Sequence, residues 1–313
     1  MPFYLVTGGA GFIGSNIVKE LVRRNDRIRI IDNLSTGKLE NIEDYLKNIE
    51  FIKEDIRDFS ACQKAVRGVN YVLHQAALPS VKRSIDDILS SNSTNIDGTL
   101  NILEAAKREG VKKVVFASSS SVYGNTDTLP KTESMAANPL SPYAVEKYTG
   151  EQYCKIFHEI YGLRTVCLRY FNVFGPGQDP ASEYSAVIPK FIYSMLKKQP
   201  PVIYGDGYQS RDFTYVENVV EANLLACHSQ KVGRGEVINI GGGNRTTLNQ
   251  LVSYLSEIIG YDGSVLYEKA RKGDVLHSLA DITSAQSLLN YNVKVKMKEG
   301  LNRTVEWFRG KRL

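Results

Sequence analysis

Tyr143 and Lys147 form the first pair in this sequence whose types and spacing point to chemistry. They stand four residues apart near the start of a predicted helix over 142–162, which places both side chains on one helix face. A phenol has a pKa of about 10, and a nearby ammonium lowers that pKa because it favours the phenolate. The pair therefore predicts a tyrosine that acts as a general base on a substrate hydroxyl near neutral pH.

Four consecutive serines, Ser118 to Ser121, end the predicted strand over 112–120 that precedes this helix. A serine hydroxyl is needed to hold the reacting hydroxyl, and the carboxyl ends of strands line the ligand crevice in a doubly wound fold. A Tyr-x-x-x-Lys spacing is weak evidence by itself, and its alternative interpretation is a surface tyrosine beside a solvated lysine. The serine cluster, together with the glycine loop described next, favours the catalytic interpretation.

The segment TGGAGFIG follows a predicted strand over 3–7 and opens a predicted helix over 12–24. In this context Gly8 permits a tight turn, Gly11 lets a pyrophosphate approach the backbone, and Gly14 lets the helix pack closely on the strand. The helix would direct its free amides toward the phosphates. A tight strand-to-helix turn without a ligand is the alternative, so the assignment needs support from elsewhere in the sequence.

Asp32 gives that support, because it lies 18 residues after Gly14 at the end of the second predicted strand. A carboxylate at this place can accept both hydroxyls of an adenosine ribose and would repel a 2′-phosphate, which favours NAD over NADP. Its alternative is a capping residue before a turn. Asp55 ends the next predicted strand and would meet the adenine edge. A cationic nicotinamide would lower the pKa of Tyr143 further.

The predicted elements that position these residues alternate between strands and helices. This alternation predicts an α/β fold with a doubly wound parallel Rossmann sheet and helices on both faces. We expect 1–172, with a returning segment about 216–243, to form an NAD-binding Rossmann domain, and 173–215 with 244–313 to form a smaller C-terminal α/β substrate domain. The first domain has predicted strands at 3–7, 27–32, 50–55, 71–77, 112–120 and 163–172, and predicted helices at 12–24, 93–109 and 142–162.

The composition of the 313-residue chain limits its partners. The net charge of +5 is spread along the sequence in short basic doublets, which indicates no nucleic-acid surface but suits a phosphorylated substrate. No apolar run reaches the roughly 18 residues of a membrane span. The four cysteines lack a C-x-x-C pair and no signal peptide is evident, so we expect free thiols and a cytoplasmic protein. The four histidines have no metal-ligand spacing, and we expect no metal.

A group of motifs identifies the family that this sequence resembles. TGGAGFIG, Asp32-Asn33, Asn95, SSSSVYG, Tyr143-x-x-x-Lys147 and RYFNVFGPG are similar to motifs of the extended short-chain dehydrogenase/reductases, over essentially the whole chain. Within that superfamily the sequence resembles the nucleotide-sugar 4-epimerases, which keep NAD bound throughout turnover. The resemblance implies that Ser119, Tyr143 and Lys147 are the catalytic residues and that Asn95 supports the lysine.

The residues after the catalytic serine distinguish among reactions of this superfamily. The 4,6-dehydratases resemble S-T-D-E-V-Y-G, and the uronate decarboxylases place a glutamate before V-Y-G, whereas this chain carries Ser120 and Ser121 there. Serine hydroxyls cannot carry out those extra proton transfers unaided at neutral pH. The sequence therefore predicts reversible oxidation at the sugar C4, rotation of the 4-keto sugar and return of the hydride to the opposite face.

The resemblance and the reading of the motifs imply two sets of binding residues. The nucleotide of a UDP-sugar would be held tightly by phosphate-pairing arginines and a stacking tyrosine, so that the sugar can turn over. The cofactor set is Gly8, Gly11, Phe12, Ile13, Gly14, Asp32, Asn33, Ser35, Thr36, Gly37, Asp55, Ile56, Gln75, Ala76, Ala77, Asn95, Tyr143, Lys147 and Tyr170. The substrate set is Ser80, Lys82, Ser120, Ser121, Tyr143, Asn172, Val187, Lys190, Tyr204, Arg211, Arg271, Asp274 and Ser278.

The expectation about which sugar is the substrate depends on Ser278. In related epimerases a tyrosine at this position restricts the pocket to glucose and galactose, whereas a small residue admits an N-acetyl group. Pro79 also stands where the galactose-type enzymes have a lysine. The sequence therefore looks most like the UDP-N-acetylglucosamine 4-epimerases, although a serine that merely fills a turn would leave both sugars equally used.

Other functions stay open at this point. A UDP-glucuronate or UDP-galacturonate 4-epimerase would need a contact to the C6 carboxylate, for which Lys82 or Arg83 is available. A dehydrogenase that releases its product, or a redox-sensing NAD-binding protein, would use the same fold. The family commonly forms homodimers through the helices near 93–109 and 142–161, so we expect a homodimer.

Overall fold

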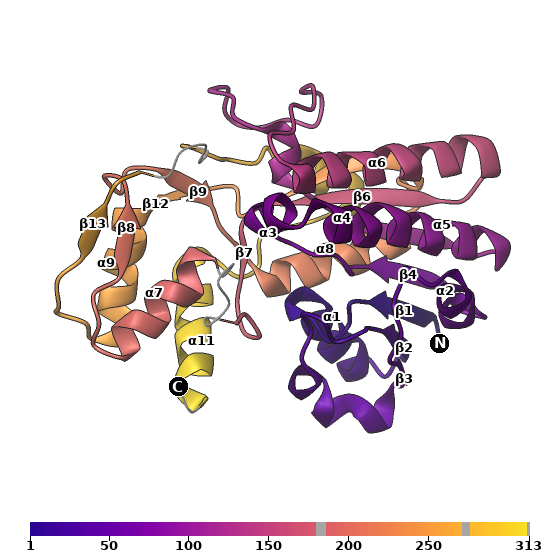
Figure 1. The fold of residues 1–313 in the computed structure, drawn as a ribbon, viewed down its shortest axis with the longest axis horizontal. Coiled ribbons are helices and arrows are strands. Elements are labelled where there is room, and N and C mark those ends of the chain that lie inside the picture. Colours follow the sequence, from indigo (N-terminus) through magenta and orange to yellow (C-terminus); the bar gives the residue numbers. More distant parts are fainter. Residues whose placement is uncertain (180–185, 271–275, 312–313) are drawn as a thin grey trace.

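The computed structural model describes residues 1–179, 186–270 and 276–311. Its centre is a parallel seven-stranded sheet with the strand order β11-β6-β5-β4-β1-β2-β3 (Figure 1). This is the predicted doubly wound α/β class, and the order reverses between β1 and β4, where such folds bind their ligands. The strands are β1 (Phe3–Thr7), β2 (Arg27–Ile31), β3 (Glu50–Ile52), β4 (Tyr71–His74), β5 (Lys113–Ser119), β6 (Thr165–Tyr170) and β11 (Arg234–Ile240).

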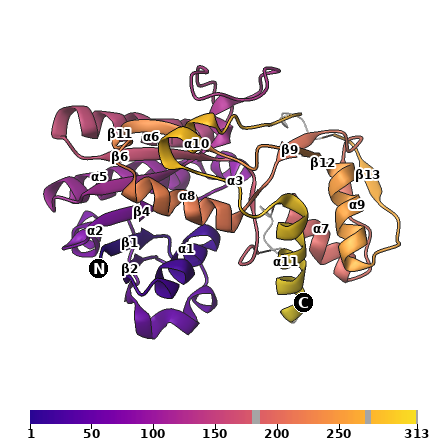
Figure 2. The ribbon, with the colours of Figure 1, turned by 180° about the vertical axis from the view of Figure 1, so that it is seen from behind.

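Helices cover both faces of the sheet. Ile17 and Val219 pack into the core of one face, under α1 and α8, while Ala61, Leu103 and Cys154 pack into the core of the other, under α2, α5 and α6. Seen from behind, α10 lies beside β11, and α8 packs against α10, β5 and β6 (Figure 2). The helices are α1 (Phe12–Arg23), α2 (Phe59–Val66), α3 (Val81–Asp86), α4 (Ile88–Asn92), the π-helix η3 (Ser93–Asp97), α5 (Gly98–Arg108), α6 (Pro142–Tyr161), α8 (Val216–His228) and α10 (Thr283–Leu289), with short 3-10 turns η1 (Leu39–Asn41), η2 (Glu43–Asn48) and η4 (Ser120–Tyr123).

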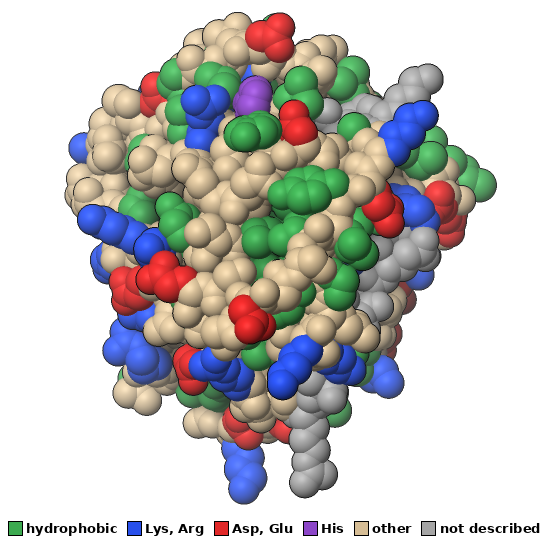
Figure 3. Space-filling model, turned by 90° about the vertical axis from the view of Figure 1, so that its left-hand side faces the viewer, with side chains coloured by type: hydrophobic (Ala, Val, Ile, Leu, Met, Phe, Trp, Pro, Cys, Tyr) green, Lys and Arg blue, Asp and Glu red, His purple; other side chains and the backbone are tan. Residues whose placement is uncertain are grey.

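A smaller lobe stands beyond the carboxyl edge of the sheet (Figure 1). This lobe contains three short strand pairs, in which β10 pairs with β7, β12 with β9 and β13 with β8. On the face at its outer end, hydrophobic side chains gather near the centre, and acidic and basic side chains alternate around the edge (Figure 3). Its elements are β7 (Val173–Phe174), α7 (Val187–Leu196), β8 (Val202–Tyr204), β9 (Ser210–Asp212), β10 (Thr214–Tyr215), β12 (Arg245–Thr247), α9 (Leu248–Ile259), β13 (Leu266–Glu268) and α11 (Met297–Gly310).

The ends of α6 follow from its local sequence. The Ser141 hydroxyl accepts a hydrogen bond from the Ala144 amide at the N-terminus, and Pro142 occupies the first turn, where its missing N–H is not needed. Gly162 ends the helix in the left-handed conformation, with φ of +71°. These signals place Tyr143 and Lys147 in the first two turns of the helix, as predicted.

The described residues also bear on membranes, metals and thiols. Within them, no helix combines the length and the apolar composition that crossing a bilayer requires. No three histidine, cysteine or acidic side chains of these ranges come together as a possible metal site. All four cysteines lie within these ranges, where they are buried and unpaired.

Candidate active site

A cleft of about 1900 Å³ opens at the carboxyl ends of the sheet strands, facing the smaller lobe. The glycine loop, Asp32, the serine cluster and both Tyr143 and Lys147 line it. Small-molecule sites usually occupy about 300–1,000 Å³, so this cleft has room for a dinucleotide and a substrate together. Every residue of the predicted cofactor set except Asn95 lies on its wall.

The glycine loop has the shape that a phosphate cradle requires. Gly8 adopts φ of +65°, a conformation that L side chains rarely take, and its amide donates to the Ile31 carbonyl at 2.9 Å. A Cβ on Gly14 would stand 2.1 Å from the Gly8 oxygen, whereas a Cβ on Gly11 would meet only that oxygen at 3.2 Å. The absence of a side chain at Gly14 thus lets α1 pack closely on the loop, and the absence of one at Gly11 leaves open space that fits a pyrophosphate.

Gly14→Ala is expected to weaken NAD binding by at least about tenfold, equivalent to 1.4 kcal/mol. The new methyl group would collide with the Gly8 carbonyl and push the loop away from the helix amides. Calorimetric titration of the purified variant with NAD measures the effect. Gly310→Ala is the matched control, because Gly310 is also helical but a Cβ there would meet nothing within 4 Å. Equal NAD affinity of the two variants would contradict the role of Gly14.

Asp32 lies at the end of β2 with 8% of its surface exposed. Its carboxylate accepts the Ala10 amide at 2.9 Å and the Leu34 amide at 2.8 Å. Burial raises the pKa of Asp32, and the two amides oppose that rise. A carboxylate has about four acceptor positions, so lone pairs remain for ribose hydroxyls. The residues present therefore fit NAD.

The Asp55 carboxylate already has hydrogen-bonding partners among its neighbours. The Asn33 amide donates to it at 2.8 Å, and Arg57 forms an ion pair with it at 2.7 Å. The hydrogen bond from Arg57 is the largest cause that lowers the pKa of Asp55 to about 2. Asp55 thus stays ionised on the cleft wall, and its contact with an adenine stays a prediction.

The three predicted catalytic residues meet where β5 ends beside α6. The Lys147 ammonium donates to the Ala117 carbonyl at 2.7 Å and lies 5.8 Å from the centre of the Tyr143 ring. The Ser119 side chain interacts with Tyr143 and lowers the pKa of its hydroxyl. The Tyr143 amide donates to the buried Ser84 hydroxyl at 3.0 Å, which anchors the start of α6 on α3.

Without a bound cofactor, burial dominates the pKa of Tyr143. Burial raises this pKa to about 12, and the interaction with Ser119 only partly offsets that rise. Burial also lowers the pKa of Lys147 to about 8, against the attraction of Glu146 and Glu151. Desolvation disfavours the charged forms of both groups. A phenolate at Tyr143 thus needs further positive charge in the cleft, which a cationic nicotinamide would provide.

The support of Lys147 by Asn95 is indirect. Asn95 lies in the π-helix η3, where its side chain donates to Glu146 at 2.6 Å and accepts the Leu78 amide at 2.8 Å. Lys147 bonds instead to Ala117. Asn95 thus holds the residue beside the lysine on α6, and it holds the start of the segment that carries Ser80 into the cleft.

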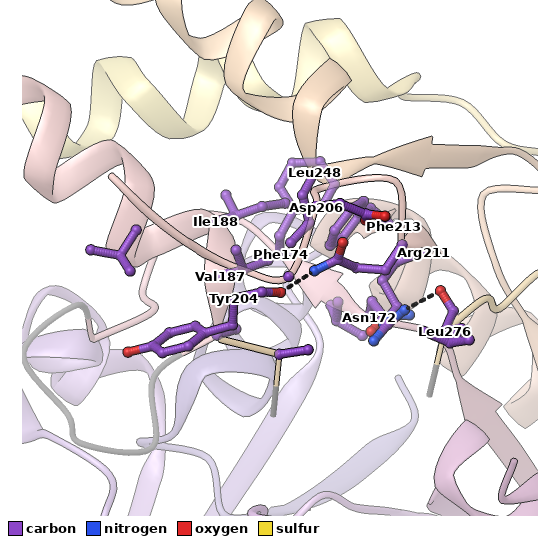
Figure 4. Close-up of a pocket in the computed structure, with 16 residues that line it drawn as sticks. Asn172, Phe174, Val187, Ile188, Tyr204, Asp206, Arg211, Phe213, Leu248 and Leu276 are labelled. Atoms are coloured by element: carbon purple, nitrogen blue, oxygen red, sulfur yellow. Dashed lines mark hydrogen bonds between the residues drawn. The ribbon is translucent and has the colours of Figure 1, made fainter. Parts of the chain in front are cut away.

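The substrate set divides between this cleft and a cavity of about 440 Å³ in the smaller lobe. The ring of Tyr204 and the guanidinium of Arg211 lie at opposite sides of that cavity (Figure 4). Asn172 and Arg211 line both spaces and so mark their junction. Ser80, Lys82, Ser120, Ser121, Lys190 and Ser278 lie on the cleft, Val187 lies on the cavity, and Arg271 and Asp274 lie outside the described residues.

Sequence reasoning missed Asp212, a buried carboxylate beside the predicted substrate residues. Fully buried, it accepts the Gly242 amide at 2.7 Å and the Ala280 amide at 3.1 Å. Its carbonyl accepts the Asn172 side chain at 3.1 Å, and its amide donates to the Ser278 hydroxyl at 3.4 Å. Burial raises its pKa to about 6. Asp212 is thus hydrogen-bonded to two predicted substrate residues, Asn172 and Ser278. The sequence feature that could have pointed to it is its place next to Arg211 in the segment Ser-Arg-Asp-Phe.

Comparison with known proteins places this geometry in context. Residues 4–241 match the model of the "NAD dependent epimerase/dehydratase family". The chain is 45% identical to a UDP-N-acetylglucosamine 4-epimerase from Methanobrevibacter ruminantium M1, solved with UDP-N-acetylmuramic acid; the match covers 98% of each chain with a TM-score of 0.94.

Two further solved structures extend the range of sugars among similar proteins. A UDP-glucose 4-epimerase from Thermotoga maritima, solved with UDP-glucose, is 42% identical over 98% of each chain with a TM-score of 0.93. A UDP-glucuronic acid 4-epimerase from Bacillus cereus, solved with UDP-glucuronic acid and NAD, is 34% identical over 98% of each chain with a TM-score of 0.90.

Proposed function

Because the chain belongs to the NAD dependent epimerase/dehydratase family and resembles its UDP-sugar 4-epimerases, we propose that it interconverts UDP-N-acetylglucosamine and UDP-N-acetylgalactosamine. UDP-glucose and UDP-galactose are possible further substrates. One observation carries the choice of reaction. Tyr143, Lys147 and Ser119 all line the cleft, and the two residues after Ser119 are serines with hydroxyl groups rather than acidic residues. The site can take a proton from a hydroxyl, but it lacks a group at these positions for elimination or decarboxylation.

The chain's own residues move one proton and hold the rest of the substrate. The Tyr143 oxygen takes the proton of the sugar C4 hydroxyl, while the Ser119 hydroxyl holds the same sugar oxygen. Lys147, fixed at the Ala117 carbonyl, keeps its positive charge beside the tyrosine ring. NAD, when bound, supplies a reversible hydride acceptor at the sugar C4.

Epimerisation also requires that the sugar rotate while the nucleotide stays bound. The 440 Å³ cavity supports this division, because Tyr143 does not line it, and among the described residues Asn172, Val173, Ala186 and Arg211 line both the cavity and the cleft. We assign the uracil and ribose to this cavity and the diphosphate to its junction with the cleft. Arg211, which donates to the Leu276 carbonyl at 3.0 Å, is positioned to pair with phosphate oxygens there.

The uronate alternative depends on a cation for the C6 carboxylate. Lys82 lies on the cleft, but its ammonium is 3.2 Å from Asp86, and its side chain is 57% exposed. An exposed lysine that already has an acidic partner is a weak ligand for a second carboxylate. The geometry therefore disfavours Lys82 as the uronate contact, whereas Arg83 also lines the cleft and keeps the uronate enzyme as the alternative function.

A homodimer is part of the same proposal. Leu89 on α4 is 80% exposed and Ile160 on α6 is 66% exposed, so apolar side chains of these helices face outward. Burying them against a second copy would remove that apolar surface from water. The mass of the protein in solution decides between one copy and two.

The decisive experiment incubates the purified protein separately with UDP-N-acetylglucosamine, UDP-glucose and UDP-glucuronate, without added NAD, and resolves the products by chromatography. We expect epimerisation of UDP-N-acetylglucosamine to an equilibrium mixture. Turnover that stops unless NAD is added would indicate a dehydrogenase. Epimerisation of UDP-glucuronate alone would indicate the uronate enzyme, and no turnover of any sugar would contradict the proposal.

A further inference from the structure

Three polar residues of α6 recur at every fourth position and reach the same strand. Tyr143, Lys147 and Glu151 share one face of the helix. Lys147 donates to the Ala117 carbonyl, Glu151 accepts from Ser118, and Ser119 interacts with Tyr143. Two successive turns of α6, at Lys147 and Glu151, are thus hydrogen-bonded to two successive residues of β5.

Glu151 also bonds to the neighbouring strand. The Ser118 hydroxyl donates to its Oε1 at 2.5 Å. Arg169 of β6 donates from Nε to Oε1 at 2.8 Å and from Nη2 to Oε2 at 2.7 Å. Ser118 and Arg169 are paired across β5 and β6 in the sheet register. One carboxylate therefore binds two adjacent strands at the level of the catalytic serine.

This ion pair is deeply buried, and the backbone around it is tightly packed. The side chains of Arg169 and Glu151 are 5% and 1% exposed. A Cβ on Gly150 would stand 2.4 Å from the Phe116 ring, so α6 packs closely on β5 at this point. A doubly hydrogen-bonded Arg–carboxylate pair fixes orientation as well as distance. A buried ion pair seldom adds net stability over apolar packing, which leaves geometry as its main contribution.

We propose that Glu151 is a positioning residue of the reaction proposed above. It sets the distance between α6 and the end of β5, and so presents Tyr143 and Lys147 to Ser119 and the substrate. Its negative charge also favours the protonated form of Lys147 against burial. Glu146 acts in the same direction.

Ser118→Ala tests this role, because it removes the hydrogen bond between Glu151 of α6 and β5 and leaves the Glu151–Arg169 ion pair in place. We expect kcat to fall between about tenfold and 100-fold, as for an ångström-scale misplacement of reacting groups. KM for the UDP-sugar should stay within about twofold, because Ser118 does not line the cavity assigned to the nucleotide. We also expect faster amide hydrogen exchange in residues 117–121 and 143–147.

Thr165→Val is the matched control. The Thr165 hydroxyl is buried in β6 and donates to the Cys154 carbonyl of α6 at 2.6 Å, so this variant also removes a sheet-to-α6 hydrogen bond of similar cost. It acts far from Tyr143, and its kcat and exchange near 143–147 should match the unaltered protein. If Ser118→Ala matched Thr165→Val in both kcat and exchange, the positioning role would be overturned. If the unaltered protein turned over no UDP-sugar, the proposed function would fail, while the exchange comparison would still test the contact.

Discussion

Tyr143→Phe is expected to lower kcat for UDP-N-acetylglucosamine by about a thousandfold, within the range that a positioned general base contributes. The phenol oxygen is the atom that takes the proton from the sugar hydroxyl, and phenylalanine has no replacement for it. The Ser119 hydroxyl would remain, but a serine beside the substrate cannot accept that proton at neutral pH without a base. Chromatographic assay of both epimers at saturating substrate measures the loss.

The fold should survive this change. The anchor between α3 and α6 is made by the Tyr143 backbone amide, which phenylalanine keeps. Loss of one hydroxyl should cost about 1 kcal/mol of the free energy of unfolding. Tyr148→Phe is the control, because Tyr148 is partly exposed on the same helix but does not line the cleft. Comparable activity of the two variants would contradict the assignment of Tyr143 as the base.

The sequence predicted the features that depend on local patterns. Helical spacing put Tyr143 and Lys147 on one face of α6, and the strand-end rule put Ser119 opposite them. The turn chemistry of the glycine loop also followed from local geometry, because only glycine tolerates the contacts at Gly8 and Gly14. These inferences need only the period of a helix or strand and the direction of a parallel sheet.

The effect of burial on Tyr143 could not be predicted from the sequence, because burial is set by the whole fold. A spacing of four residues indicates that an ammonium is near, but not how much water is excluded from both groups. In the protein without a bound cofactor, desolvation raises the pKa of Tyr143 to about 12. The indirect contact of Asn95 has the same origin, since the π-helix η3 directs its side chain toward Glu146.

Buried polar partners were missed for a related reason. Asp212 and the Glu151–Arg169 pair look like ordinary surface charges in the sequence, because their partners are backbone amides or residues on other strands. Only the packed structure shows that each is almost fully buried. Such residues hold others in place and touch no substrate, so a search for reactive groups passes over them.

We predict that the sugar specificity depends on the side chain at Ser278, which is 8% exposed and lines the cleft that Asn172 and Arg211 also line. The Asn172 amide donates to the Ser278 hydroxyl at 3.3 Å, and the Ser278 amide donates to the Ser210 carbonyl at 3.1 Å. The backbone bond fixes the direction of the side chain. A larger side chain at this position must therefore extend into the space beside the sugar or displace Asn172.

Ser278→Tyr is expected to lower turnover of UDP-N-acetylglucosamine and to spare UDP-galactose. The ring would occupy the space assigned to the N-acetyl group, and overpacking of this kind costs about 1–3 kcal/mol, or about 5-fold to 160-fold in kcat/KM. A hydroxyl at C2 is smaller than an acetamido group and would escape the clash. Parallel assays with the two substrates measure the ratio of their kcat/KM values.

Ser278→Ala separates the space at this position from its hydrogen bond. Alanine removes the acceptor for Asn172 but leaves the room, so its ratio of kcat/KM for the two sugars should match that of the unaltered protein. If Ser278→Tyr kept the unaltered ratio, Ser278 would not be the gate, whether both activities persisted or both fell together. A change of ratio in Ser278→Ala would instead locate the selectivity in the contact between Ser278 and Asn172.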